Sequence, residues 1–169
     1  MAFITDDGDI KITLPDHVVA RRFDDSTHGL SHCMKAVDYI IEMKERIVFL
    51  EIKDPDNPKA KSENCTIFLK SLRSGKIDSE LKTKFRDSFL YEWACGRTEK
   101  PIHFWFLIGA EMLDSGQLIR RTESLKSQLP IYGPAGKPWK NTFVAGCLVM
   151  NLSAWNKQLI DFPATRLST

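Results

Sequence analysis

The alternation of hydrophobic and polar positions is clearest in residues 37–54, where two short apolar strands are joined by a polar turn. Side chains alternate between the two faces of a strand, so every second residue shares a face. In both strands one face is wholly apolar, whereas the other also carries Asp38 in the first strand and Glu51 and Lys53 in the second. A turn at residues 44–45 sets a register in which Asp38 lies opposite Glu51. The pattern therefore predicts two carboxylates side by side on one face of a hairpin.

A row of large apolar residues predicts the longest helix, at residues 78–95. The members of this row recur every fourth position: Leu81, Phe85, Phe89 and Trp93. We expect the row to pack on the wholly apolar face of the hairpin. Because strands and helices alternate along the rest of the chain, the pattern indicates an α/β fold. The other predicted elements are strands at 9–15, 101–110 and 141–150, helices at 16–23, 115–129 and 154–160, and a polar loop at 54–65.

The composition is typical of one globular domain spanning residues 1–169, because 43% of the residues are hydrophobic and 27% are charged. The four cysteines lie far apart without a CxxC pair, which argues against a zinc ribbon or a disulfide framework and favours a reducing compartment. The acidic N-terminus lacks the basic start of a signal peptide, and no apolar run approaches the ~18 residues of a membrane span. We therefore expect a cytoplasmic protein with no membrane segment.

Charge is unevenly distributed, although the formal net charge is only +2. Residues 57–100 hold ten basic and six acidic side chains. Such a section suits contact with the phosphate backbone of a nucleic acid. An ordinary solvated helix face and loop would have the same composition, so the charge pattern alone does not separate the two interpretations.

The facing carboxylates of Asp38 and Glu51 are the strongest candidate for chemistry. Like charges directly opposite each other destabilise a sheet. A hard divalent cation would offset this repulsion, since Mg²⁺ is usually held by one or two carboxylates together with waters or phosphates. Lys53 lies on the same face and can reach a metal-bound water or a phosphate oxygen. The alternative is that Glu51 and Lys53 form an ordinary exposed ion pair at a strand end.

Asp38 followed, after a short hairpin, by the sequence Glu51-Ile52-Lys53 resembles the PD-(D/E)xK nuclease superfamily, which has the restriction-endonuclease-like fold. The resemblance covers residues 10–110 and implies an αβββαβ core with a mixed central sheet flanked by helices. A C-terminal strand and helix would then be an elaboration. It also implies that Asp38, Glu51 and the main-chain carbonyl of Ile52 bind Mg²⁺ or Mn²⁺, and that Lys53 orients or deprotonates the attacking water.

The resemblance leaves two contributions to the site open. Members of the superfamily often add an acidic residue from the first helix, and the helix after the motif often adds a Gln, Lys or Arg. The basic candidates, which are also predicted to contact nucleic acid, are Lys82, Lys84 and Arg86. The acidic candidates are Asp16, Asp24 and Asp25.

The function implied by the resemblance is Mg²⁺-dependent hydrolysis of phosphodiester bonds, most readily in DNA. A homodimer is a further expectation, because many related enzymes cut two strands as dimers. The alternative is a catalytically inactive member of the same fold that binds nucleic acid or a protein partner.

Overall fold

A mixed five-stranded sheet forms the centre of the computed structural model, which describes residues 2–5, 8–137 and 139–168. Its strands lie in the order β3-β4-β5-β6-β7. The first three are antiparallel neighbours, and β5, β6 and β7 are parallel. The α/β class and the mixed central sheet are therefore confirmed. The strands are β3 (Val19–Arg22), β4 (Tyr39–Glu42), β5 (Ile47–Lys53), β6 (Ile102–Ile108) and β7 (Gly146–Asn151).

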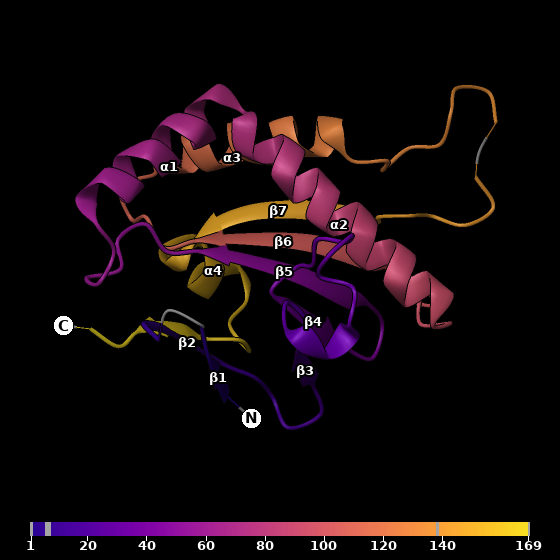
Figure 1. Ribbon diagram of the computed structural model, residues 1–169, viewed down its shortest axis with the longest axis horizontal. Coiled ribbons are helices and arrows are strands. Elements are labelled where there is room, and N and C mark those ends of the chain that lie inside the picture. The colour runs from indigo at the N-terminus through magenta and orange to yellow at the C-terminus, as the bar shows by residue number, and fades with distance from the viewer. Residues whose placement is uncertain (1, 6–7, 138, 169) are drawn as a thin grey trace.

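Three helices cover one face of this sheet, above it in Figure 1. Their apolar residues form a buried cluster with side chains of the central strands, including Phe49 and Phe104. Gly75, with a φ of 75°, lies between the first two helices and closes one while it opens the other. The helices are α1 (Ser62–Ser74), α2 (Lys76–Ala94) and α3 (Ser115–Gln128).

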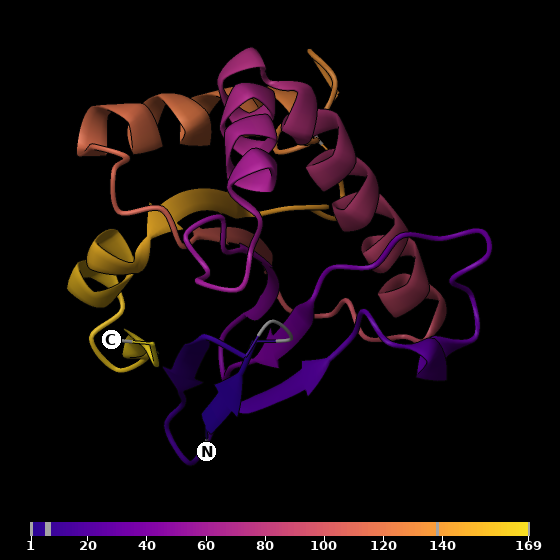
Figure 2. The ribbon, with the colours of Figure 1, turned by 60° about the vertical axis from the view of Figure 1, so that its left-hand side comes forward.

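The opposite face of the five-stranded sheet packs on a small second sheet of order β1-β2-β8 and on a short helix. Both chain ends lie on this side of the molecule (Figure 1, Figure 2). A second buried cluster, centred on Trp105 and Trp155, fills the space between the layers. The remaining elements are β1 (Ala2–Ile4), β2 (Ile10–Thr13), a 3-10 helix (Ser26–His28), α4 (Leu152–Gln158) and β8 (Ala164–Arg166).

The predicted hairpin and its register are confirmed. Ile40 pairs with Phe49 across β4 and β5, and the N–H of Met43 donates to the carbonyl of Arg46 at 3.0 Å. The same register extends to Asp38 and Glu51, the positions that set the candidate site.

The helix predicted at residues 16–23 is wrong, because Val19–Arg22 forms strand β3 and pairs with β4. The apolar residues of this strand, Val19 and Ala20, are β-branched or small, and pairing with the exposed edge of the hairpin satisfies the backbone groups of the strand. The first helix of the predicted αβββαβ order is therefore not present at that place, and the restriction-endonuclease-like fold stays a prediction.

The predicted packing of the longest helix is also wrong. The all-apolar hairpin face, which includes Tyr39 and Leu50, packs on the small sheet and α4, while α2 covers the face that carries Glu51. A four-residue step turns a helix by about 400°, so each step moves the row by about 40°. The row therefore rotates away from the sheet along the helix, and its last member, Trp93, is 64% exposed. The face that α2 buries follows the 3.6-residue period instead, through Ile77, Leu81, Lys84, Phe85, Ser88 and Glu92.

The remaining elements match the sequence pattern more closely. The buried strand at 101–110 and the helix at 115–129 are confirmed as β6 and α3, whereas the strand predicted from residue 141 begins only at Gly146. Helix α1 was not predicted, because its sequence is largely polar and buries Leu72 alone. In the described part of the chain, no helix is long and apolar enough to cross a membrane.

Candidate active site

The predicted residues meet where β5 ends beneath α2. Glu51 lies two residues before the end of the buried strand β5, and its side chain is 0% exposed. Asp38 comes directly before β4, in the register that places it beside β5. Its carboxylate oxygen Oδ2 accepts a hydrogen bond of 2.7 Å from the N–H of Ile52. The sheet therefore positions both carboxylates on the side that faces α2.

Lys84 of α2 reaches into this pair of carboxylates. Its Nζ lies 2.8 and 3.0 Å from the two Glu51 carboxylate oxygens and 3.3 Å from Oδ1 of Asp38. The ammonium thus supplies positive charge between two acids whose repulsion had suggested a metal ion. The chain itself therefore supplies positive charge between the two carboxylates.

Two further charged groups border the same cluster. The Lys53 ammonium lies 3.0 Å from Oε1 of Glu51, and the Asp24 carboxylate lies 3.6 Å from the Lys84 ammonium. The Lys53 side chain is 35% exposed, whereas that of Lys84 is 9% exposed. The cluster is therefore closed beneath α2 and open toward solvent where Lys53 and Asp24 lie.

Burial controls the electrostatics of the cluster. It raises the pKa of Glu51 to about 7, helped by the neighbouring charge of Asp38 and opposed by Lys53 and Lys84. Burial alone would lower the pKa of Lys84, but the charges of Glu51 and Asp38 outweigh it and raise that pKa. The pKa of Lys53 is raised in the same way, chiefly by Glu51 against its burial. Burial therefore favours the protonated form of the Glu51 carboxylate.

Helix α2 also holds the segment that leads to Asp38. Oδ2 of Asp87 accepts a hydrogen bond of 3.0 Å from the N–H of Lys35, and Oγ of Ser88 accepts one of 3.0 Å from the N–H of Val37. The helix that supplies Lys84 thus fixes the backbone immediately before the facing carboxylate. These contacts were not predicted, because side chain to backbone bonds between distant segments leave no periodic signal.

The chain beyond Lys53 is fixed by a second set of polar contacts. Arg166 of β8 donates to both oxygens of Asp54, at 2.8 and 2.9 Å, and to the carbonyl of Gly109 at 2.9 Å. A third partner of Arg166 is the carboxylate of Asp9. The small sheet is therefore tied to the end of β5, next to the candidate site.

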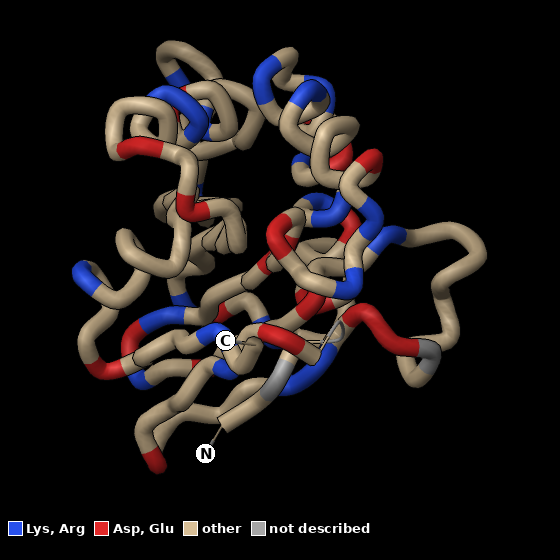
Figure 3. The backbone as a smooth tube through the Cα atoms, turned by 90° about the vertical axis from the view of Figure 1, so that its left-hand side faces the viewer, with Lys and Arg blue, Asp and Glu red and all other residues tan. Residues whose placement is uncertain are grey.

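The structure divides the predicted nucleic-acid contacts into two groups. Lys84 lies in the carboxylate cluster, whereas Lys82 is half-buried beside α3 and Arg86 is exposed. Lys82 donates to Gln128 of α3 at 3.4 Å, and Arg86 is well exposed and pairs with Asp87. Lysine and arginine recur along the helical layer (Figure 3).

The structure also selects among the acidic candidates. Asp24 contacts Lys84, whereas Asp25 accepts hydrogen bonds from Thr27 and Asp16 lies in the turn before β3. The acid that joins the cluster therefore comes from the segment after β3 and not from a first helix.

A divalent cation can be tested against these donors. Within the ranges that the structure describes, no group of three or more His, Cys, Asp or Glu side chains has metal-binding geometry. The two carboxylates of Asp38 and Glu51 nevertheless converge on one point, which the Lys84 ammonium marks. Two carboxylates suffice for Mg²⁺ when substrate phosphate and water complete its shell. The residues therefore fit Mg²⁺, provided that the Lys84 side chain moves aside, and the carbonyl of Ile52 stays a predicted ligand.

Comparisons with family models, curated proteins and solved structures find no match to this chain. The residues of the site are therefore the basis for assigning a function.

Proposed function

We propose that this protein is a Mg²⁺-dependent nuclease that hydrolyses phosphodiester bonds, in the manner of the PD-(D/E)xK superfamily. The observation that carries the proposal is the meeting of Asp38, Glu51 and Lys53 at one open end of the central sheet. A buried carboxylate with a raised pKa, here Glu51, grouped with a partly exposed lysine, is typical of active sites. The substrate that suits best is DNA.

Each residue has a separate part in this proposal. Asp38 and Glu51 would hold the metal ion, which supplies charge stabilisation at the phosphate and a more acidic water. Lys53, at the exposed side of the cluster, would orient the attacking water or contact a phosphate oxygen. Lys84 of α2 contacts the carboxylates of Asp38 and Glu51. It would contact the substrate phosphate once its ammonium leaves them.

One observation favours the alternative, an inactive nucleic-acid- or protein-binding module of the same fold. The Lys84 ammonium already pairs with both carboxylates, and the resulting buried cluster requires no metal ion to be satisfied. A metal ion would have to compete with this internal cation. The two functions therefore differ in whether Mg²⁺ or Mn²⁺ binds at all.

The test is cleavage of plasmid DNA, single-stranded DNA and RNA with added Mg²⁺ or Mn²⁺, by wild type, Glu51→Gln and Lys53→Ala. We expect both substitutions to abolish cleavage, and Lys53→Ala to retain metal binding in a calorimetric titration. Lys126→Ala is the matched control. Lys126 lies in α3, outside the carboxylate cluster; like Lys53 it is partly exposed, at 38%, and pairs with an acid, Glu123, at 2.9 Å.

The outcomes separate the two functions. Cleavage that survives both Glu51→Gln and Lys53→Ala would place the chemistry elsewhere and refute the proposal. Wild-type protein that neither cleaves these substrates nor binds either metal would favour the non-catalytic alternative.

A further inference from the structure

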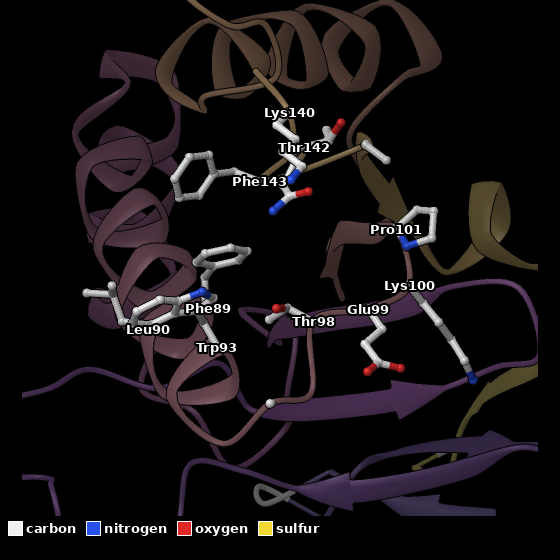
Figure 4. Close-up of a pocket in the computed structure, with 13 residues that line it drawn as sticks. Phe89, Leu90, Trp93, Thr98, Glu99, Lys100, Pro101, Lys140, Thr142 and Phe143 are labelled. Atoms are coloured by element: carbon white, nitrogen blue, oxygen red, sulfur yellow. The ribbon is translucent and has the colours of Figure 1, made fainter. Parts of the chain in front are cut away.

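A hollow of about 1080 Å³ lies beside the C-terminal half of α2, on the flank that faces away from the Lys84 cluster. It is bounded by α2, by the turn before β6 and by the segment before β7 (Figure 4). A smaller hollow of about 190 Å³ adjoins it and shares Phe89, Leu90 and Phe143. We call the two hollows together the α2 groove. Its lining also includes Lys82, Phe85, Arg86, Trp93, Glu99, Lys100 and Lys140.

Aromatic rings follow the α2 groove in a connected series. The ring centroids of Phe89 and Phe143 are 4.7 Å apart, as are those of Phe143 and Trp139, and Phe85 adjoins Phe89. Trp93 is well exposed at the open end of the groove, although a large aromatic ring usually gains from burial. Phe85 itself is buried, whereas Trp93, Trp139 and Phe143 offer aromatic surface that the fold leaves partly exposed.

Charge in the α2 groove is predominantly positive. The residues that line it include four cations, Lys82, Arg86, Lys100 and Lys140, and one acid, Glu99. Lys82 and Arg86 flank the smaller hollow, so the cations extend from the middle of α2 to the segment before β7. A ligand that fits must therefore combine flat apolar faces with repeated negative charge.

We infer that the α2 groove binds a single-stranded segment of nucleic acid. Exposed bases stack on aromatic side chains regardless of sequence, while a basic groove follows the phosphates. A base-paired duplex cannot offer its base faces in this way, whereas charge alone would suit both forms. The inference deepens the proposed function and rests on it for the substrate class: a nucleic acid with an unpaired segment.

The test is binding of fluorescent oligothymidylate, oligouridylate and a blunt DNA duplex to cleavage-deficient Glu51→Gln protein. In this background, Trp93→Ala and Phe143→Ala should each weaken binding of the single strands about 5- to 100-fold, the usual effect of losing one stacking ring. Affinity for the duplex should stay within about twofold, because its phosphate contacts remain. Comparison of oligothymidylate with oligouridylate shows whether the groove prefers single-stranded DNA or RNA.

Two further variants control for general damage. Ile67→Ala removes an apolar side chain of α1 that is as exposed as Trp93, at 64%, and lies outside the groove; it should leave all affinities unchanged. Trp93→Phe keeps a ring, so it should retain most of the affinity for single strands but lose the quenching of tryptophan fluorescence that stacking on Trp93 produces.

Equal affinity of wild type and both alanine variants for single strands would overturn the inference, as would tighter binding of duplex than of single strands. The former result would leave the groove as a surface for a protein partner. The proposed function is tested separately, with Trp93→Ala and Phe143→Ala in protein that retains Glu51. If these variants cleave duplex DNA with added metal, the nuclease proposal stands even where single-strand binding fails. Single-strand binding without any cleavage would support the groove and refute the nuclease.

Discussion

The buried carboxylate of Glu51 predicts an unusual dependence of stability on pH. Burial raises its pKa from an ordinary 4.5 to about 7 in the folded protein. Between these two values the folded state keeps a proton that the unfolded state has lost, so the free energy of unfolding falls as pH rises through this window. The two values differ by about 2.5, and one pKa unit corresponds to about 1.4 kcal/mol. The loss therefore amounts to about 3 kcal/mol between pH 4.5 and 7.

The perturbation that isolates this effect is Glu51→Gln, measured by urea unfolding in EDTA over a series of pH values. Titrating groups outside the cluster contribute equally to both proteins, so the difference in unfolding free energy reports on Glu51 and the groups that contact it. We expect the free energy of unfolding of wild type to fall by about 3 kcal/mol relative to that of Glu51→Gln as pH rises through the window, whatever the difference between the two proteins at low pH.

Glu92→Gln is the matched control, because Glu92 is also buried but pairs with Arg97 and Arg21. Although burial opposes its charge, these partners lower the pKa of Glu92. The stabilisation that ionised Glu92 provides is therefore fully present above the ordinary pKa of a glutamate and is lost only at lower pH. Glu92→Gln should run parallel to wild type between pH 4.5 and 7. A flat difference between wild type and Glu51→Gln would mean that Lys84 and Lys53 keep Glu51 ionised, and would refute the reasoning.

Two further predictions concern the surroundings of Glu51. Asp38→Asn should abolish the rise in melting temperature that Mg²⁺ gives wild type, since a metal ion stabilises only the state that binds it; an undiminished rise would place the metal elsewhere. Gly109→Ala should destabilise the protein by about 1–3 kcal/mol in urea unfolding, because an added Cβ would lie 2.1 Å from Oδ1 of Asp54; an unchanged midpoint would show that the Asp54–Arg166 contact can shift freely.

The hairpin could be predicted because its register depends on local information. The turn and the alternation of apolar residues both act within residues 37–54, and a slip by one residue would turn the apolar face outward. The facing positions of Asp38 and Glu51 followed from that register. The length and buried character of β6 and α3 were predictable for the same reason, since each depends on periodicity within one element.

The partner of each sheet face could not be predicted in this way. Strand β8 comes from the end of the chain and pairs with β2 near its start, so the layer that covers the all-apolar hairpin face is assembled from segments far apart in sequence. The edge pairing of β3 with β4 likewise overrides the helical interpretation of residues 16–23. The sequence places Lys84 among the basic candidates for the site, but its contact with both carboxylates depends on which face α2 covers.

The position of the charges beneath α2 is difficult to explain by stability alone. Glu51 lies at the end of a strand whose preceding residue on that face, Phe49, contacts Phe85 of α2 through an apolar core. An apolar residue at position 51 would extend this core, and replacing a buried ion pair by apolar side chains is often neutral or stabilising. Anchoring of α2 does not require the ion pair either, because Leu81 and Phe85 already bury apolar surface against the sheet. The charged cluster is therefore not needed for stability at the end of β5 beside Lys53, which is the arrangement expected where a binding or catalytic requirement sets the side chains.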